Sequence, residues 1–206
     1  MKKNLGLVHV YTGNGKGKTT WALGIAMRAL GQGLKVSIIQ FMKGGAYTGE
    51  YISAKNFLSN VNFMQFGKQC VKEQKQMKLQ GIDSDAPLFD YIREDIDCGD
   101  CRDCFVNDDE QKKFVKDAFN LSKKVITSGD YNLVVLDEIN VALNLGFLKL
   151  EDVLSLIKNK FEKTELVLTG RNAPKELFEV ADYASDIQMI KHPFNKGVLA
   201  RRGIEY

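Results

Sequence analysis

The chain has 206 residues, of which 44% are hydrophobic and 27% charged, an ordinary globular composition that argues against a disordered or fibrous protein. Its 29 basic and 26 acidic side chains give a formal charge of +3, too weak a field to indicate a nucleic-acid partner. The sequence shows no apolar run of membrane-spanning length and no signal pattern at its amino end, so we expect a cytoplasmic protein without a membrane partner.

The amino-terminal third is typical of a βαβ unit. Residues 5–11 form an apolar, strand-like run that stops at a glycine-rich loop, and residues 20–30 have the apolar pattern of a helix. Gly31 and Gly33 end this helix, and residues 35–41 supply a second β-rich run. A further strand is predicted over residues 61–66.

The remainder continues the alternation after a polar stretch. Residues 67–109 hold all four cysteines, and we interpret them as an insertion. Helices are predicted over 109–128, over 151–160 and from Pro174, and strands over 133–136, 166–169 and 187–190. The predicted fold is one α/β domain over residues 1–206, with a mainly parallel sheet flanked by helices, of the P-loop NTPase-like (RecA-like) kind.

The loop between the first strand and helix has the composition of a phosphate-binding loop. Its glycines leave backbone N–H groups at a helix start open to an anion. Lys18 adds a cation, and the Thr19 hydroxyl can ligate magnesium. The loop is a variant, because Thr12 stands where the first glycine usually falls. The predicted nucleotide-binding residues are Gly13, Asn14, Gly15, Lys16, Gly17, Lys18, Thr19 and Thr20.

Two carboxylates follow the apolar strand Leu-Val-Val-Leu of residues 133–136. In open α/β sheets the carboxyl ends of strands form the ligand-binding edge, so Asp137 and Glu138 are expected near the phosphates. Together with Thr19 they are the predicted magnesium ligands, directly or through water. The sequence leaves open which carboxylate contacts the metal.

The cysteines suggest a second metal site. Cys98, Cys101 and Cys104 form a C-x-x-C-x-x-C run, and Cys70 is available as a fourth thiolate for zinc or an iron–sulfur cluster. Several aspartates around the run oppose thiolate formation, so a site without metal stays open as well.

Three stretches beyond the loop carry a family resemblance. Residues 135–143 read Val-Leu-Asp-Glu-Ile-Asn-Val-Ala-Leu, residues 168–171 read Leu-Thr-Gly-Arg, and the chain ends with Lys-His-Pro-Phe at 191–194 and Gly-Ile-Glu-Tyr at 203–206. With the loop, they resemble the P-loop corrinoid adenosyltransferases. The aromatic segment that faces the corrin ring in that family is not found; Phe63 and Phe66 are candidates, or core residues. Arg201 and Arg202 stand where a glutamine-like residue is expected.

The resemblance implies that ATP donates its 5′-deoxyadenosyl group to cobalt(I) of a corrinoid, in cobalamin biosynthesis or salvage, with release of triphosphate. Stabilisation of the departing triphosphate calls for catalytic roles of Lys18, Thr19 and Glu138. Arg171, just beyond a strand end, is expected to add a phosphate contact; the alternative is a surface arginine at a helix start. The resemblance also implies an electron donor that reduces cobalt, and a homodimer. Since cobalt(I) is the nucleophile, no Ser-His-Asp or Cys-His pair is needed.

Two other functions combine a phosphate loop with this fold class. A thymidine-kinase-like phosphotransferase would move the γ-phosphate and could bind zinc through cysteines. A RecA-like ATPase would use Glu138 to polarise water. The products distinguish the three: triphosphate, a phosphorylated nucleoside with ADP, or ADP with phosphate.

Overall fold

The computed structural model describes residues 5–45, 48–70, 104 and 106–206. Within these ranges, six strands form one sheet in the order β3-β2-β4-β5-β1-β6, and all neighbouring pairs are parallel. The strands are β1 (Val8–Thr12), β2 (Val36–Phe41), β3 (Val61–Phe66), β4 (Leu133–Asp137), β5 (Glu165–Thr169) and β6 (Tyr183–Asp186). Parallel strands place their carboxyl ends at one edge, where a ligand site is expected.

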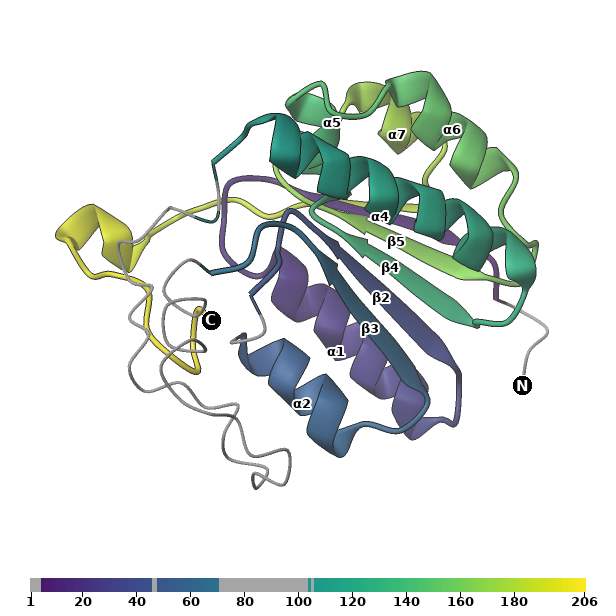
Figure 1. Cartoon of the computed structure of the whole chain (residues 1–206), viewed down its shortest axis with the longest axis horizontal. Helices are drawn as coiled ribbons and strands as arrows, with labels where there is room; N and C mark the ends of the chain where they lie inside the picture. The colour runs from purple at the N-terminus through teal and green to yellow at the C-terminus, as the bar shows by residue number, and fades with distance from the viewer. Residues whose placement is uncertain (1–4, 46–47, 71–103, 105) are drawn as a thin grey trace.

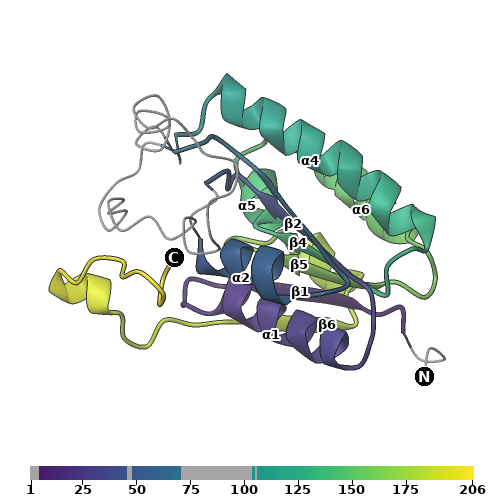
Figure 2. The same ribbon diagram turned by 60° about the horizontal axis from the view of Figure 1, so that its bottom comes forward.

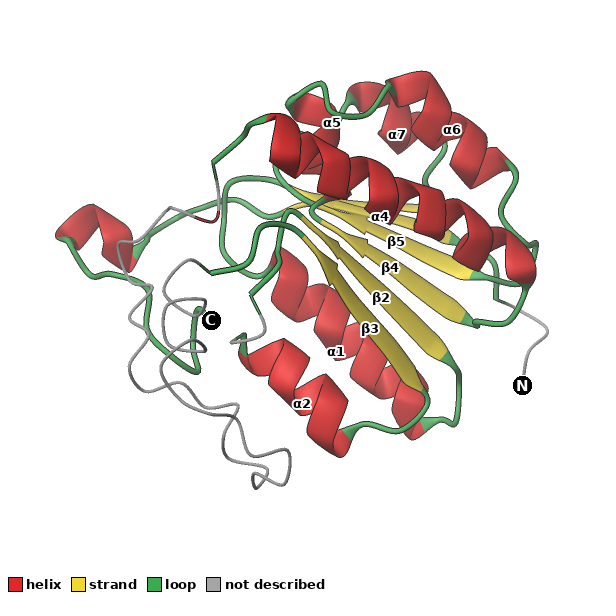
Figure 3. Cartoon of the chain, in the orientation of Figure 1, coloured by secondary structure: helices red, strands yellow, loops and turns green. Residues whose placement is uncertain are grey.

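Helices cover both faces of this sheet (Figures 1 and 3). On one face lie α1 (Lys18–Gly31) and α2 (Gly49–Phe57); on the other lie α4 (Asp109–Ser128), α5 (Ile139–Asn144), α6 (Leu150–Lys158) and α7 (Lys175–Glu179). The carboxyl-terminal segment, with the 3-10 turn η3 (Pro193–Lys196), extends beside the edge where the phosphate loop lies (Figures 1 and 2). The predicted α/β, P-loop NTPase-like class is confirmed.

The longest helix shows how local sequence sets an element. The Asp108 side chain accepts a hydrogen bond from the backbone N–H of Gln111 and caps the start of α4. Gly129, with φ of 76°, ends the helix in the left-handed conformation that glycine adopts at little cost. The buried side chains recur at helical spacing and form one stripe against the sheet: Val115, Ala118, Phe119, Ser122, Val125 and Ile126.

The central strands are buried on both faces, as expected for parallel strands between two helix layers. Every residue of β2 and of β4 is buried. One apolar cluster joins the sheet to α4, α5 and α6, and the other joins it to α1 and α2. Polar side chains at the ends of these two strands are therefore enclosed by packed elements, and each needs a specific partner.

Most predicted elements are confirmed with small differences at their ends, but the predicted position of the last strand is wrong. The prediction placed it over residues 187–190, whereas β6 spans Tyr183–Asp186. The strand lies at the sheet edge and is exposed throughout, so it lacks the apolar signal of the inner strands. The sequence analysis also missed α2 and the short α5.

The insertion predicted over residues 67–109 is bounded by the observed end of β3 at Phe66 and start of α4 at Asp109. Residues 71–103 and 105 lie outside the described residues, so its architecture stays a prediction. Among the residues that the structure covers, no helix has both the length and the apolar character to span a bilayer.

Candidate active site

The phosphate loop connects β1 to α1, as the sequence predicts. Lys18, the first residue of α1, is buried, and its ammonium donates hydrogen bonds to the carbonyl oxygens of Gly13 and Gly15, both at 2.7 Å. Burial lowers the pKa of Lys18, and the carboxylate of Glu138 is the main opposing influence. The ammonium is thus held at the centre of the loop. When a triphosphate binds, its charged oxygens would replace the two carbonyl oxygens as hydrogen-bond acceptors of Lys18.

The segment after β6 braces this loop. The backbone N–H of Gly15 donates to the carbonyl of Ile187 at 2.7 Å, and the N–H of Ile187 donates to Thr12 at 2.9 Å. The side-chain oxygen of Asn14 accepts from the N–H of Met189 at 2.9 Å. Ile187 lies just past the end of β6, where its backbone bonds to the loop and its side chain packs against the apolar cluster below α1. This packing explains the apolar signal that led the prediction to place the strand too late.

Two loop glycines are required by this close approach. Gly13 has φ of 100°, and a Cβ there would lie 2.4 Å from the Ile187 carbonyl oxygen; at Gly15 the same atom would be 2.8 Å away. Glycine adopts such a conformation without steric cost and lets another backbone pass. These glycines thus allow residues 187–188 to pass close to the loop, in addition to leaving its N–H groups open to an anion, as inferred from the sequence.

We expect Gly13→Ala to lower the free energy of unfolding by about 2 kcal/mol, because the alanine would be strained and would clash with backbone. Gly24→Ala in α1 is the matched control, since nothing lies within 4 Å of a Cβ there. This change should instead stabilise the protein by about 0.5–1 kcal/mol. Urea unfolding followed by fluorescence of the single tryptophan, Trp21, measures both. Equal stability of the two variants would contradict the bracing of the loop.

Asp137, at the end of β4, is the centre of the acidic site. It is 1% exposed, and four donors reach its carboxylate. Oδ1 accepts from the hydroxyls of Thr19 at 2.9 Å and Thr169 at 2.6 Å, and Oδ2 accepts from the side chains of Gln40 and Lys43, both at 2.9 Å. Burial opposes ionisation, but Lys43 and the hydroxyl donors outweigh it and lower the pKa of Asp137.

Glu138 differs from its neighbour in conformation and in the direction of its pKa shift. Its φ is 67°, which is strained for a residue with a side chain, and its N–H donates to the Thr169 hydroxyl at 3.1 Å. Burial and the adjacent Asp137 raise the pKa of Glu138. The strained turn places two carboxylates at one strand end in different environments, as in sites that divide roles between acidic groups.

Thr19 and Asp137, predicted from distant motifs, are in direct contact. A hydroxyl and carboxylate oxygens are hard donors of the type that Mg²⁺ prefers, and Mg²⁺ in nucleotide sites commonly uses few protein ligands together with phosphates. Within the described ranges no group of three or more His, Cys, Asp or Glu residues is arranged as a metal site. The donor types present therefore suit a metal held jointly with a polyphosphate.

The sequence analysis missed the polar end of β2. Gln40 is fully buried; its amide donates to Asp137 and its carbonyl accepts from Gln65 of β3 at 2.8 Å. Lys43 follows the strand and pairs with Asp137 at 2.9 Å, with Glu50 of α2 at 3.8 Å. A glutamine near the end of a mostly apolar strand was the available signal, but only the adjacency of β2 and β4 gives it a partner.

Arg171 and the carboxyl-terminal segment border a cleft of about 400 Å³ next to the phosphate loop. Arg171 is exposed, and within the described part of the chain it forms no ion pair. Glu205 binds Lys16 of the loop at 2.5 Å and Arg201 at 3.2 Å, and these cations lower the pKa of Glu205 to about 2. The cleft is lined by Asn14, Arg171, Met189, His192, Pro193, Phe194, Asn195, Val198, Leu199, Ala200, Arg201 and Glu205.

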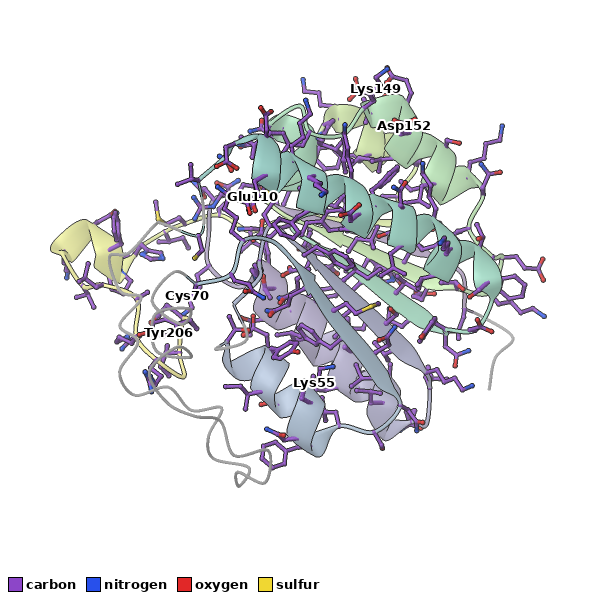
Figure 4. The ribbon with its side chains drawn as sticks, in the orientation of Figure 1. Lys55, Cys70, Glu110, Lys149, Asp152 and Tyr206 are labelled. Atoms are coloured by element: carbon purple, nitrogen blue, oxygen red, sulfur yellow. The ribbon has the colours of Figure 1, made fainter. Side chains whose placement is uncertain are left out.

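Other predicted residues are placed less centrally or not described. Thr20 is exposed on α1. Cys98 and Cys101 lie outside the described residues; Cys70 is buried beyond β3 (Figure 4) and Cys104 is half-buried. Zinc or iron–sulfur binding stays a prediction. Phe63 is 3% exposed and packs edge-on against Tyr51, so it is a core residue and not a corrin-facing aromatic.

Comparisons with known proteins identify the family of this chain. Residues 4–102 and 83–206 match the family model described as ATP:corrinoid adenosyltransferase BtuR/CobO/CobP. Similar proteins named corrinoid adenosyltransferase occur in Pseudomonas aeruginosa, at 32% identity over 98% of this chain and 84% of that protein, and in Sinorhizobium sp, at 32% over 98% and 80%. One from Escherichia coli K12 is 30% identical over 98% of this chain and 86% of its own. The chain therefore belongs to the ATP:corrinoid adenosyltransferase family.

Proposed function

We propose that this protein transfers the 5′-deoxyadenosyl group of ATP to the cobalt(I) centre of a corrinoid and releases triphosphate. The observation that carries this function is the family match along nearly the whole chain, combined with a phosphate loop that contacts the acidic end of β4. The thymidine-kinase-like and RecA-like alternatives have no support from the relatives in Pseudomonas aeruginosa, Sinorhizobium sp and Escherichia coli, which bear the name corrinoid adenosyltransferase.

In the reaction, the cobalt(I) electron pair forms a bond to the 5′ carbon while the bond from that carbon to the triphosphate oxygen breaks. The leaving electron pair and the negative charge stay on the triphosphate. The protein must therefore align the ribose and stabilise the departing charge. We assign the second task to Lys18, the loop N–H groups and Arg171, which are cations and donors at or beside the loop.

Thr19, Asp137 and Glu138 are the proposed magnesium ligands. Thr19 and Asp137 are already joined by a 2.9 Å hydrogen bond, and Glu138 adds a carboxylate at the same turn. When bound, magnesium would supply positive charge to the triphosphate. Burial raises the pKa of Glu138, whereas Lys43 and the hydroxyl donors lower the pKa of Asp137, so Asp137 is proposed as the main anionic ligand.

The cleft between Arg171 and the carboxyl-terminal segment is the proposed site for the organic part of a substrate. Its walls combine apolar side chains with arginines, a lining that suits a large ring carrying polar substituents. An electron donor for cobalt, a homodimeric assembly and a cytoplasmic location remain predictions from the sequence.

The direct test mixes the protein with ATP, magnesium and chemically reduced cobalamin. We expect the absorption spectrum of adenosylcobalamin to develop, with one triphosphate released per corrinoid, as resolved by anion-exchange chromatography. Omission of the corrinoid should leave ATP intact. Formation of ADP with phosphate, or transfer of a phosphoryl group to a nucleoside, would contradict the proposed function.

A further inference from the structure

The cation at the acidic site comes from the protein itself. The Lys43 ammonium lies 2.9 Å from Oδ2 of Asp137 and 3.8 Å from Oε1 of Glu50, and its side chain is 20% exposed. Met42, just before it, has φ of 59°, so the chain turns sharply out of β2 at this point. Lys43 thus follows the strand end, and its ammonium interacts electrostatically with three carboxyl groups: Asp137, Glu138 and Glu50.

The Asp137 carboxylate has no acceptor position left for a metal. Each of its oxygens already accepts two hydrogen bonds, which is the usual capacity of a carboxylate oxygen. A divalent cation can contact Asp137 only if one donor withdraws. Thr19 is itself a proposed ligand and can remain as the site rearranges.

Among the other three donors, Lys43 is the one able to leave. Gln40 and Thr169 are fully buried, and their side chains have further hydrogen bonds to Gln65 and to the N–H of Glu138. Lys43 is partly exposed and has a long flexible side chain. As a cation, it would also be repelled by a metal at the same oxygen.

We propose that Lys43 is the resident counter-ion of Asp137, that a divalent cation displaces its ammonium toward Glu50, and that Lys43 thereby sets the metal affinity of the site. This role rests on the proposed function, because it takes the metal of that site as its competitor. Glu50 is a suitable second position: its Oε1 lies 3.8 Å from the ammonium and, among the residues that the structure describes, accepts one hydrogen bond, at 3.3 Å from Gln40.

The test measures binding of Mn²⁺ alone, as a paramagnetic substitute for Mg²⁺, by electron paramagnetic resonance without ATP. Lys43→Met keeps the length of the side chain and removes its charge, and we expect it to bind Mn²⁺ at least about tenfold more tightly than the unmodified protein. Lys43→Arg, the charge-retaining control, should stay within about threefold. Mn²⁺ binding by Lys43→Met that is equal to or weaker than that of the unmodified protein, or undetectable in both, would overturn the proposal.

Thermal unfolding separates this role from simple structural support. Lys43→Met should unfold at a lower temperature than the unmodified protein without metal, because a buried carboxylate loses its partner, and Mn²⁺ should recover more of the melting temperature for this variant than for the unmodified protein. A variant that only damages the fold would not be rescued. If Lys43→Met does not fold, Lys43→Gln takes its place in both measurements.

Glu50→Gln gives an independent arm. Removing the second acceptor should weaken Mn²⁺ binding several-fold, since the displaced ammonium would have no anionic partner. Unchanged Mn²⁺ binding by this variant would remove Glu50 from the proposal. Adenosyl transfer by the unmodified protein is assayed separately. If the unmodified protein does not transfer adenosyl groups but Lys43→Met binds Mn²⁺ more tightly, only the proposed function is contradicted. If the unmodified protein does transfer them but Lys43→Met binds Mn²⁺ no more tightly, only the counter-ion role is contradicted.

Discussion

Lys18→Met is expected to reduce kcat/KM for adenosyl transfer by about 10²–10³-fold, equivalent to about 3–4 kcal/mol of transition-state stabilisation. The reason is the position of the ammonium, which is buried at the centre of the phosphate loop and held there by two carbonyl oxygens at 2.7 Å. In this low-dielectric setting, a cation acts strongly on charge that develops on the departing triphosphate. The rate of adenosylcobalamin formation at saturating corrinoid measures the effect.

Arg28→Met is the matched control for this change. Arg28 lies in the last turn of the same helix, α1, and is exposed, so its removal takes one cation from the element without touching the loop. Its kcat/KM should stay within about twofold of the unmodified protein. If Lys18→Met retained more than a tenth of the activity, Lys18 would not be the main stabiliser of the leaving triphosphate.

Asp137→Asn should both destabilise the fold and abolish metal-dependent activity. An amide cannot accept all four hydrogen bonds that converge on the carboxylate, and Lys43 would be left beside a neutral group. Breaking such a buried pair costs about 3 kcal/mol or more. Urea unfolding at neutral pH gives the loss in stability, and the magnesium dependence of adenosyl transfer gives the loss in function.

The pH dependence of this loss has a definite sign. The pKa of Asp137 is lower in the folded protein than its ordinary value of 3.8, so its contribution to stability is fully present above that value and disappears as the pH falls through the lower, folded one. The stability difference between Asp137→Asn and the unmodified protein should therefore shrink in acid. Asp117→Asn, at an exposed position of α4, should change stability by less than about 0.5 kcal/mol throughout. A pH-independent difference would show that Asp137 is not an ionised partner.

Features that depend on neighbouring residues in the chain were predictable from the sequence. The ends of α4 follow from a capping aspartate and a terminal glycine, and both lie within one turn of the helix that they bound. The phosphate loop is likewise a local motif, since its N–H groups, lysine and threonine come from one short segment. The buried strand β4 was visible as a continuous apolar run, and β2 as a β-rich run.

Features that depend on residues far apart in the chain could not be predicted from the sequence. β6 is exposed at the sheet edge and was predicted four residues too late, because the apolar Ile187 lies just past its end, where its side chain packs against the core and its backbone bonds to the phosphate loop. Phe63 gave no sign of whether it faced a substrate or the core until its packing against Tyr51 was known. A single polar residue such as Gln40 inside a strand has no interpretation until the neighbouring strand is identified.

By itself, the sequence determined the fold class, the phosphate loop, the acidic strand end and the family, because periodicity and short motifs depend only on residues close together in the chain. Only the tertiary structure decided that Asp137 meets Thr19, Thr169, Gln40 and Lys43 at one carboxylate. Those donors come from segments that approach one another because β2 and β5 flank β4 in the sheet and α1 begins beside it. Strand order is a result of long-range packing, and the charge state of a buried group follows from the neighbours which that packing supplies.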